Sequence, residues 1–207
     1  MKKIISTTKK YYENRLKKFG NNYKGMNWPN KSGQNLRFQE LLKLFKFKNS
    51  SIHDVGCGNG MLLDFLKRKR INFKEYLGTD ISQKMIDQCK INFKNKKNIN
   101  FLCVNIIKKK KIKKYDYVVS SGLFNIKNNF SSKEWQNYVY LTISKMFSLS
   151  KKGISFNLLT FDTTYRNNKL YYQSVDDLFK YCRKNISKKI FINHSYKLWE
   201  YTVYIFK

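Results

Sequence analysis

Apolar residues along this chain follow two patterns that alternate from one segment to the next. Short segments rich in apolar residues predict strands at 52–55, 76–80, 100–105, 115–120 and 154–161. The segment 115–120 has the continuous apolar character of a buried parallel strand. Segments in which apolar residues return at helical spacing predict helices at 60–69, 82–93, 132–148 and 174–185. Strands that alternate with helices in this way predict an α/β fold with a doubly wound, mainly parallel, Rossmann-like sheet.

Both ends of the chain depart from this alternation. Residues 8–48 are expected to form one or two helices around a loop. Two final strands, 190–193 and 201–206, are joined by a short turn and predict an antiparallel hairpin, which brings the sheet to seven strands. We therefore expect a single domain over 1–207, with an N-terminal helical cap or lid at 1–48 and an α/β core at 49–207.

Three serines are placed to begin helices. Ser82 is a candidate N-cap, and the patterns Ser131-x-x-Glu134 and Ser174-x-x-Asp177 are typical of helix N-termini. Gly153 is expected to mark the entry into the strand at 154–161.

The composition favours one soluble domain without a metal site. A chain of 207 residues with 42% hydrophobic content can bury a substantial core. It has no run of about 18 apolar residues, so no membrane span is expected. Its start lacks the apolar stretch of a secretory signal, and we expect a cytoplasmic protein. Cys57, Cys89, Cys103 and Cys182 form no CxxC pair, which predicts neither a metal site nor a disulfide framework.

The formal net charge of +30 allows two interpretations. A strongly basic domain is typical of nucleic-acid-binding proteins. The composition favours codon bias instead, because the chain has no alanine and only six of its 43 basic residues are arginine, whose bidentate fork suits phosphate. The densest lysine run, KKKKIKK at 108–114, lies between two predicted strands and is expected to be a solvated loop. A nucleic-acid partner is therefore disfavoured.

The turn DVGCGNG, between a predicted strand and a predicted helix, carries the candidate chemistry. Its glycines are Gly56, Gly58 and Gly60, spaced GxGxG rather than the GxGxxG of a dinucleotide fingerprint. Alternating glycines let the backbone approach a bulky, uncharged part of a ligand, and Asp54 suits a cationic ligand better than a pyrophosphate. Asp80 ends the next strand, twenty residues after Gly60, where a carboxylate can accept both hydroxyls of a ribose.

These motifs resemble those of class I S-adenosylmethionine-dependent methyltransferases. DVGCGNG is similar to the first motif of that family and LGTDIS, residues 77–82, to its second, and the resemblance in element order covers residues 35–207. It implies S-adenosylmethionine as cofactor, with the glycines beneath its methionine and ribose and Asp80 on the ribose hydroxyls. Asn105 and Ile106 would lie against the adenine, although most members have an aspartate where Asn105 stands. The residues assigned to the cofactor are Asp54, Gly56, Cys57, Gly58, Gly60, Asp80, Ile81, Asn105, Ile106 and Ser121.

Methyl transfer from a sulfonium is an in-line displacement, so the cofactor carries the activated group and no catalytic triad is required. By the resemblance, the segment SSGLFN at 120–125 faces the transferable methyl group. Asn125 is a candidate for orienting the acceptor. His194, at the end of a strand, is the candidate general base, with a surface histidine as the equal alternative. An aromatic lid over a small acceptor is expected from Tyr11, Tyr12, Phe19, Tyr23 and Trp28.

The segment SSGLFN also bears on the acceptor. It lacks the (Asp/Asn)-Pro-Pro-(Tyr/Phe) run of base-methylating DNA enzymes, so DNA base methylation is disfavoured. The sequence favours a methyltransferase that acts on oxygen or nitrogen of a small molecule or saccharide. An RNA methyltransferase, favoured by charge alone, and a catalytically silent cofactor-binding scaffold are the alternatives. The oligomeric state does not follow from the sequence.

Overall fold

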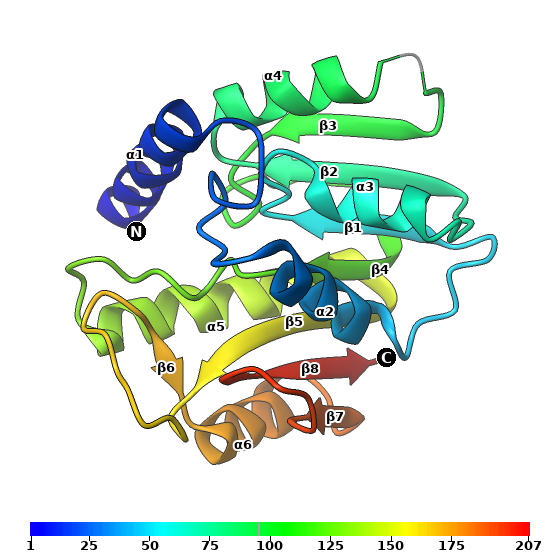
Figure 1. The fold of residues 1–207 in the computed structure, drawn as a ribbon. Coiled ribbons are helices and arrows are strands. Elements are labelled where there is room, and N and C mark those ends of the chain that lie inside the picture. The colour runs from blue at the N-terminus through cyan, green and yellow to red at the C-terminus, as the bar shows by residue number, and fades with distance from the viewer. Residues whose placement is uncertain (95) are drawn as a thin grey trace.

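From residue 51 onwards helices separate most of the strands, although β3 and β4, β5 and β6, and β7 and β8 follow each other without a helix between them (Figure 1). The computed structural model describes residues 1–94 and 96–207. The helices are α1 (Lys2–Phe19), α2 (Lys31–Leu42), α3 (Met61–Arg68), α4 (Gln83–Asn92), α5 (Ser132–Leu149) and α6 (Val175–Asn185). The strands are β1 (Ser51–Val55), β2 (Glu75–Asp80), β3 (Ile99–Cys103), β4 (Tyr115–Ser120), β5 (Ser150–Thr160), β6 (Tyr172–Gln173), β7 (Ile190–Asn193) and β8 (Glu200–Phe206). The helices expected before residue 48 are confirmed as α1 and α2, with a loop between them.

The sheet places the first strand near its middle. The strand order is β3-β2-β1-β4-β5-β8-β7, with β6 paired to β5 beside this path. The first five strands run parallel to their neighbours in this group, whereas β8 is antiparallel to β5 and β7. The predicted doubly wound, mainly parallel sheet with an antiparallel C-terminal pair is confirmed. The strand order reverses between β1 and β4, and ligands of such sheets bind at this switch point.

Within the described residues the sheet has eight strands rather than the expected seven. The additional strand, β6, has two residues and is too short to show an apolar pattern. β5 also differs from its prediction, because it begins at Ser150 and Gly153 lies inside it, paired with Phe206. Glycine was expected outside the strand because of its low strand propensity. Here it lets β8 approach closely, since a Cβ at this position would lie 2.9 Å from the carbonyl oxygen of Ile205.

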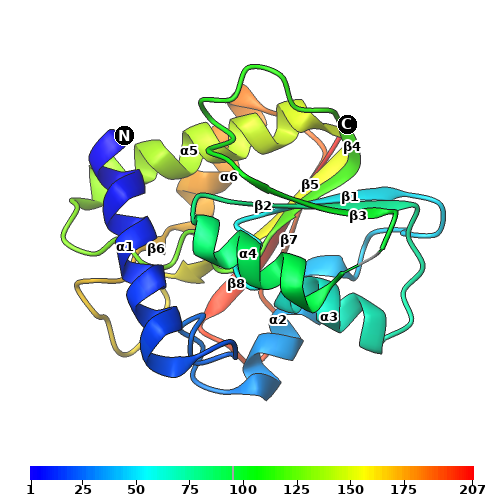
Figure 2. The ribbon, with the colours of Figure 1, turned by 90° about the horizontal axis from the view of Figure 1, so that it is seen from above.

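Helices cover both faces of the sheet. Seen from above in Figure 2, α5 and α6 lie on one side of the strands and α2, α3 and α4 on the other. Successive residues of β4 point to opposite layers: Val118 belongs to the apolar cluster that contains Val139 of α5, and Val119 to the cluster that contains Leu41 of α2. α1 covers neither face and lies beyond the carboxyl ends of β1, β2 and β3 (Figure 1). The N-terminal helix is therefore next to the switch point.

Side-chain caps begin three of the helices where the sequence predicted them. The Ser82 hydroxyl accepts a hydrogen bond from the N–H of Met85 at the start of α4. Ser131 and Glu134 form a complete capping box at α5, and Ser174 caps α6. Within the described ranges, no helix is both long and apolar enough to cross a membrane.

Candidate active site

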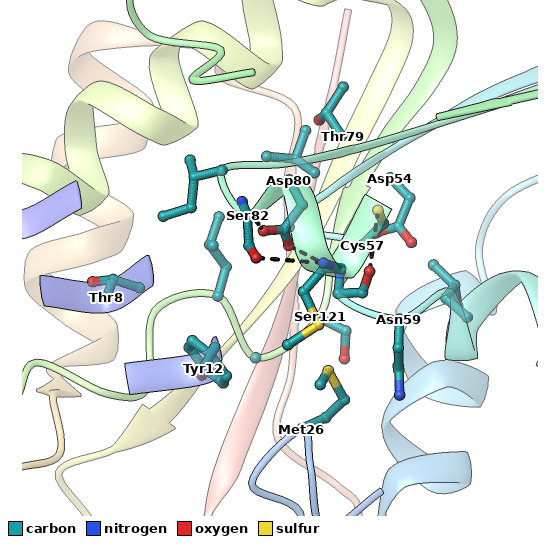
Figure 3. Close-up of a pocket in the computed structure, with 18 of the residues that line it drawn as sticks. Thr8, Tyr12, Met26, Asp54, Cys57, Asn59, Thr79, Asp80, Ser82 and Ser121 are labelled. Carbon is teal, nitrogen blue, oxygen red and sulfur yellow. Dashed lines mark hydrogen bonds between the residues drawn. The ribbon is translucent and has the colours of Figure 1, made fainter. Parts of the chain in front are cut away.

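A pocket opens at the switch point, where the carboxyl ends of β1, β2 and β4 meet the N-terminal helices. The pocket, together with the open solvent at its mouth, comprises about 1020 Å³ of space outside protein atoms. In Figure 3, Asp80 lies at its centre, Thr8 and Tyr12 lie on the α1 side, and Asn59 lies towards α2. Nine of the ten residues that the sequence assigned to a cofactor line it: Asp54, Gly56, Cys57, Gly58, Asp80, Ile81, Asn105, Ile106 and Ser121.

The glycine turn after β1 forms one wall of the pocket. Gly56, Gly58 and Gly60 have φ angles of 72°, 53° and 85°, in the left-handed region where a side chain is strained. β2 holds the turn in place, because the carbonyl oxygen of Thr79 accepts from the N–H of Gly56 at 2.7 Å and from that of the next residue at 3.0 Å. Gly60 is outside the lining and precedes α3 as its N-cap, where a Cβ would lie 2.7 Å from the ring of Phe93. Its geometry fits close packing of α3 against the end of α4.

Asp80 faces the pocket from the end of β2. Its carboxylate accepts hydrogen bonds from the backbone N–H of Gly58 at 3.0 Å and from that of Ser82 at 2.9 Å. Burial raises the pKa of Asp80 above its usual value, and the N–H groups of Ser82 and Gly58 oppose this rise. A carboxylate at the end of the second strand is placed to accept hydrogen bonds from ligand hydroxyl groups.

Two neighbouring residues of β1 have different surroundings. Asp54 lines the pocket, and the Tyr76 hydroxyl donates to its Oδ2 at 2.6 Å. Burial raises the pKa of Asp54 to about 7, against the opposing effect of this hydrogen bond. Nε2 of His53 lies 2.9 Å from Oγ1 of Thr79, and burial lowers the pKa of His53 to about 3. Burial therefore keeps His53 neutral at neutral pH and disfavours the charged form of Asp54.

The N-terminal elements close the pocket from the opposite side. The lining residues that they contribute are Ile5, Thr8, Lys9 and Tyr12 of α1, Met26 and Trp28 of the following loop, and Gln34 and Phe38 of α2. Glu13 anchors α1, because its Oε1 accepts from the Ser82 hydroxyl at 2.7 Å. Two of the aromatic residues expected in a lid, Tyr12 and Trp28, line the pocket. The others, Tyr11, Phe19 and Tyr23, are outside the lining.

Several polar atoms in the pocket lining have no hydrogen-bond partner in the described part of the chain. They are Oγ1 of Thr8, Oγ of Ser121 and both side-chain amide atoms of Asn59, all of them buried. A buried polar group without a partner costs about 1–3 kcal/mol. A polar ligand in this pocket would satisfy these atoms.

Two candidate catalytic residues lie outside the pocket lining. Asn125 is buried five residues after β4, its carbonyl oxygen accepts from the N–H of Tyr171 at 2.9 Å, and its Oδ1 has no partner among the described residues. His194 is exposed after β7, with its ring centroid 6.0 Å from that of Tyr201. Both roles stay predictions, and each requires an acceptor that extends beyond the lining.

Sequence reasoning missed Asn59, Met26 and Gln34, all of which line the pocket. Asn59 stands between two glycines of the turn, and a polar side chain there was a usable signal. Met26 and Gln34 carry no local signal, because the path of the loop and of α2 brings them to the pocket. Over the same described residues, no group of three or more His, Cys, Asp or Glu side chains is arranged to hold a metal ion.

A doubly wound sheet with a glycine turn after β1 and a carboxylate after β2 defines an α/β domain that binds a nucleoside-containing cofactor at its switch point. Comparisons with known proteins narrow this class. The family model for the methyltransferase domain matches residues 53–136. A protein of Mycobacterium tuberculosis (strain ATCC 25618 / H37Rv) that is described as a methyltransferase is 34% identical over 160 residues, which are 76% of this chain and 93% of that protein.

Solved structures of methyltransferases share the fold at low sequence identity. The N-methyltransferase NodS from Bradyrhizobium japonicum WM9, in complex with S-adenosyl-L-homocysteine, has a TM-score of 0.69 and 11% identity, covering 97% of this chain and 98% of that one. Magnesium protoporphyrin IX methyltransferase from Synechocystis PCC 6803, also with bound S-adenosylhomocysteine, has a TM-score of 0.63 and 15% identity, covering 85% and 84%. The chain therefore belongs to the class I S-adenosylmethionine-dependent methyltransferases, and S-adenosylmethionine is its cofactor.

Proposed function

We propose that this enzyme transfers the methyl group of S-adenosylmethionine to an oxygen or nitrogen atom of a small molecule or sugar unit. The observation that carries the proposal is that side chains of α1, the α1–α2 loop and α2 line the same pocket as Ser121 and Gly122, which follow β4. Magnesium protoporphyrin IX methyltransferase, which by its name acts on a small molecule, shares the fold, and NodS by its name methylates nitrogen.

The proposed cofactor placement uses the two motifs together. Asp80 holds the ribose hydroxyls, exchanging its hydrogen bond from Gly58 for bonds from the ribose. Gly56 and Gly58 let the backbone approach the methionine and ribose, and Cys57 contributes its backbone between them. The side chains of Ile81 and Ile106 lie against the adenine. Support comes from the positions of these residues around one cavity.

Asn105, Ser121 and Asp54 complete this placement. Oδ1 of Asn105 accepts from the N–H of Ile107 at 3.0 Å, so its amide nitrogen is the group that can donate to adenine. The hydroxyl of Ser121 lacks a partner among the described residues and lies beside Gly122, towards the transferable methyl group in this placement. The Asp54 carboxylate favours the cationic sulfonium electrostatically. Gly60 contributes the shape of the turn rather than a direct contact.

The amino-acid end of the cofactor is placed at Asn59 and Gln34. Both side chains are buried and line the pocket. Gln34 belongs to α2, and Figure 3 shows Asn59 towards α2, away from Thr8 and Tyr12. A side-chain amide offers donors to a carboxylate and an acceptor to an ammonium group. Both amide atoms of Asn59 have no partner among the described residues, so a zwitterionic group would satisfy donor and acceptor at once.

Bound S-adenosylmethionine supplies a methyl group activated by its sulfonium. The protein must align the acceptor, exclude water and remove a proton where the acceptor requires it. In this proposal Tyr12, Met26 and Trp28 cover the pocket and exclude water. Asn125 orients the acceptor and His194 accepts its proton, each from outside the lining described above.

We also propose that residues 1–207 act as one domain. Residues 49–207 form the core that binds the cofactor, and residues 1–48 form the cap that completes the acceptor site. The hydrogen bond between Glu13 and Ser82 supports this division, because it attaches the cap to the N-cap of α4, two residues after Asp80.

The net charge of +30 favours a second candidate, methylation of RNA. The two candidates differ in the product that carries the label when the purified protein is given methyl-labelled S-adenosylmethionine. In parallel reactions, one tube receives a low-molecular-weight extract and the other total RNA. We expect label in small molecules, whose identity then gives the methylated atom.

Label only in nuclease-sensitive polymer would replace our proposal with the RNA candidate. Cofactor binding without label in either tube would point to a catalytically silent scaffold. The Asp80→Ala variant serves as the negative control in both tubes, because loss of the ribose site should abolish transfer to any acceptor.

A further inference from the structure

A chain of buried hydrogen bonds leads from the pocket to α2. The backbone N–H of Gly122 donates to Oδ1 of Asn157 at 2.9 Å, and Nδ2 of Asn157 donates to Oε1 of Glu200 at 2.9 Å. The second carboxylate oxygen of Glu200 accepts from Nε of Arg37 at 2.8 Å. Residues from β5, β8 and α2 thus connect to the segment after β4 that forms part of the pocket.

The indole of Trp28 connects the other end of this series of hydrogen bonds, Arg37, back to Gly122. The guanidinium carbon of Arg37 lies 4.4 Å from the centroid of the Trp28 ring. Trp28 also packs against Gly122, where a Cβ would lie 2.5 Å from two carbons of the indole. Trp28 and Gly122 both line the pocket. These contacts therefore form a closed network, which we call the Trp28 network. Its members are Gly122, Asn157, Glu200, Arg37 and Trp28.

The ion pair of the Trp28 network, Arg37 and Glu200, is energetically costly because it is buried. The side chains of Arg37 and Glu200 are 8% and 0% exposed. Removing two charges from water costs several kcal/mol per ion before their attraction offsets it, so a buried ion pair is weak grounds for stability alone. An arginine has one property that an apolar residue of similar volume lacks, because its planar guanidinium can bind a carboxylate and stack on an aromatic face together. The arrangement uses both.

We propose that the Arg37–Glu200 pair is a positioning device that holds Trp28 against Gly122, so that the α1–α2 loop closes the pocket at the end where the methyl group is transferred. Arg37 and Glu200 act through Trp28 and are positioning residues. The placement of the methyl group rests on the proposed function, whereas the closure of Trp28 over Gly122 does not. Trp28 then limits both the escape of bound cofactor and the space left for the acceptor.

The test uses the fluorescence of Trp28. The other tryptophans are Trp135, which is fully buried, and Trp199, which is 58% exposed and outside the pocket lining. In a Trp199→Phe background, quenching by acrylamide therefore reports mainly on Trp28. Arg37→Met alone would leave the Glu200 charge buried without a partner and could unfold the protein. The variant of choice therefore combines Arg37→Met with Glu200→Gln, so that both side chains of the pair are uncharged.

For the neutral double variant we expect acrylamide quenching of Trp28 to rise about threefold, the scale expected when a cation–π contact of modest strength is lost. Its far-ultraviolet circular dichroism should match that of the parent, which shows that the fold is retained. Quenching equal to that of the parent protein would overturn the positioning role. This measurement needs no ligand and holds even if the proposed function is wrong.

A second measurement tests closure over the cofactor, by following the dissociation of S-adenosylhomocysteine in stopped flow. Trp28→Ala should release it about tenfold faster, and the neutral double variant should be intermediate. Trp199→Ala is the matched control and should release it at the parental rate. An unchanged rate in Trp28→Ala would overturn the lid role of Trp28. Failure of the parent protein to bind S-adenosylhomocysteine would instead contradict the cofactor placement.

Discussion

The carboxylate of Asp80 accepts a hydrogen bond from the backbone N–H of Gly58 at 3.0 Å, across 22 residues of sequence. Gly58 belongs to the turn after β1 and Asp80 ends β2, so this bond joins the two motifs on which the family resemblance rests. Parallel pairing of β1 with β2 makes the contact possible, because it brings both carboxyl ends to the same edge of the sheet.

Replacement of Asp80 should remove the proposed ribose contact and leave the fold intact. We expect Asp80→Ala to weaken S-adenosylmethionine binding more than about tenfold, because hydrogen bonds to a charged group are worth about 1.5–3 kcal/mol. Isothermal titration calorimetry measures this directly. Asp87→Ala, on the exposed surface of α4, is the matched control and should bind normally. Normal binding by Asp80→Ala would show that the ribose lies elsewhere.

Asn59 should read only the amino-acid end of the cofactor. We expect Asn59→Ala to lower the affinity for S-adenosylhomocysteine about fivefold, the worth of roughly one hydrogen bond, without changing that for methylthioadenosine, which lacks the amino-acid end. Competition between the two ligands in calorimetry gives both constants. Equal losses for both ligands would indicate a structural effect on the glycine turn, and no loss for either would remove Asn59 from the site.

Glu13 should control how firmly α1 is held over the pocket. Its carboxylate accepts from the Ser82 hydroxyl, so Glu13→Ala removes the charged partner and should accelerate backbone hydrogen exchange in α1. We expect cofactor affinity to fall about threefold, because α1 contributes four lining residues. Lys84→Ala removes one of the two long ion pairs of Glu13, at 3.8 Å on an exposed side chain, and should leave both measurements unchanged. Equal exchange rates in Glu13→Ala and the parent would contradict the anchor.

Asp54 and His53 should make opposing contributions to the pH dependence of stability. The pKa of Asp54 is raised from 3.8 to about 7 in the folded protein, so between these values the unfolded chain loses the proton first. Asp54 therefore lowers the free energy of unfolding as pH rises from about 4 to 7, by an amount on the order of a few kcal/mol. The pKa of His53 is lowered from 6.5 to about 3, so the unfolded chain gains the proton first as pH falls, and stability is lost below about pH 6.5.

Urea unfolding across this pH range separates the two contributions. The stability of Asp54→Asn relative to the parent should rise from pH 4 to 7, whereas that of His53→Gln relative to the parent should fall from pH 3 to 6.5. The comparison with the parent removes the effect of every other titrating group. A difference that does not vary with pH would mean that the corresponding residue is ionised alike in the folded and unfolded states.

His194 should affect transfer without affecting cofactor binding. Its side chain is exposed and outside the pocket lining, so His194→Gln should bind S-adenosylhomocysteine normally. As the proposed base it should contribute at least about a hundredfold to the methyl-transfer rate, which a radiolabel transfer assay at saturating cofactor measures. A rate equal to that of the parent would show that His194 has no role in methyl transfer.

Most of the element order followed from the sequence because its signals are local. Helical spacing and apolar runs depend on near neighbours, and Ser82, Ser131 and Ser174 cap helices through bonds to residues three positions away. The glycine turn and Asp80 could also be predicted, because positive φ angles favour glycine and the position of Asp80 follows from its place at the end of a predicted strand. β6 left no such mark, since two residues cannot show a period.

The rest of the site was decided only in the tertiary structure. Gly60 matches the motif, yet it packs against the ring of Phe93 and does not line the pocket. Arg37 and Glu200 are 163 residues apart, and nothing near either residue in the sequence indicates its partner. Met26 and Gln34 line the pocket only because the α1–α2 loop and α2 pack across the carboxyl edge of the sheet. Local sequence determines where a strand, helix or turn forms, whereas the side chains that share a buried space depend on how distant elements pack against each other.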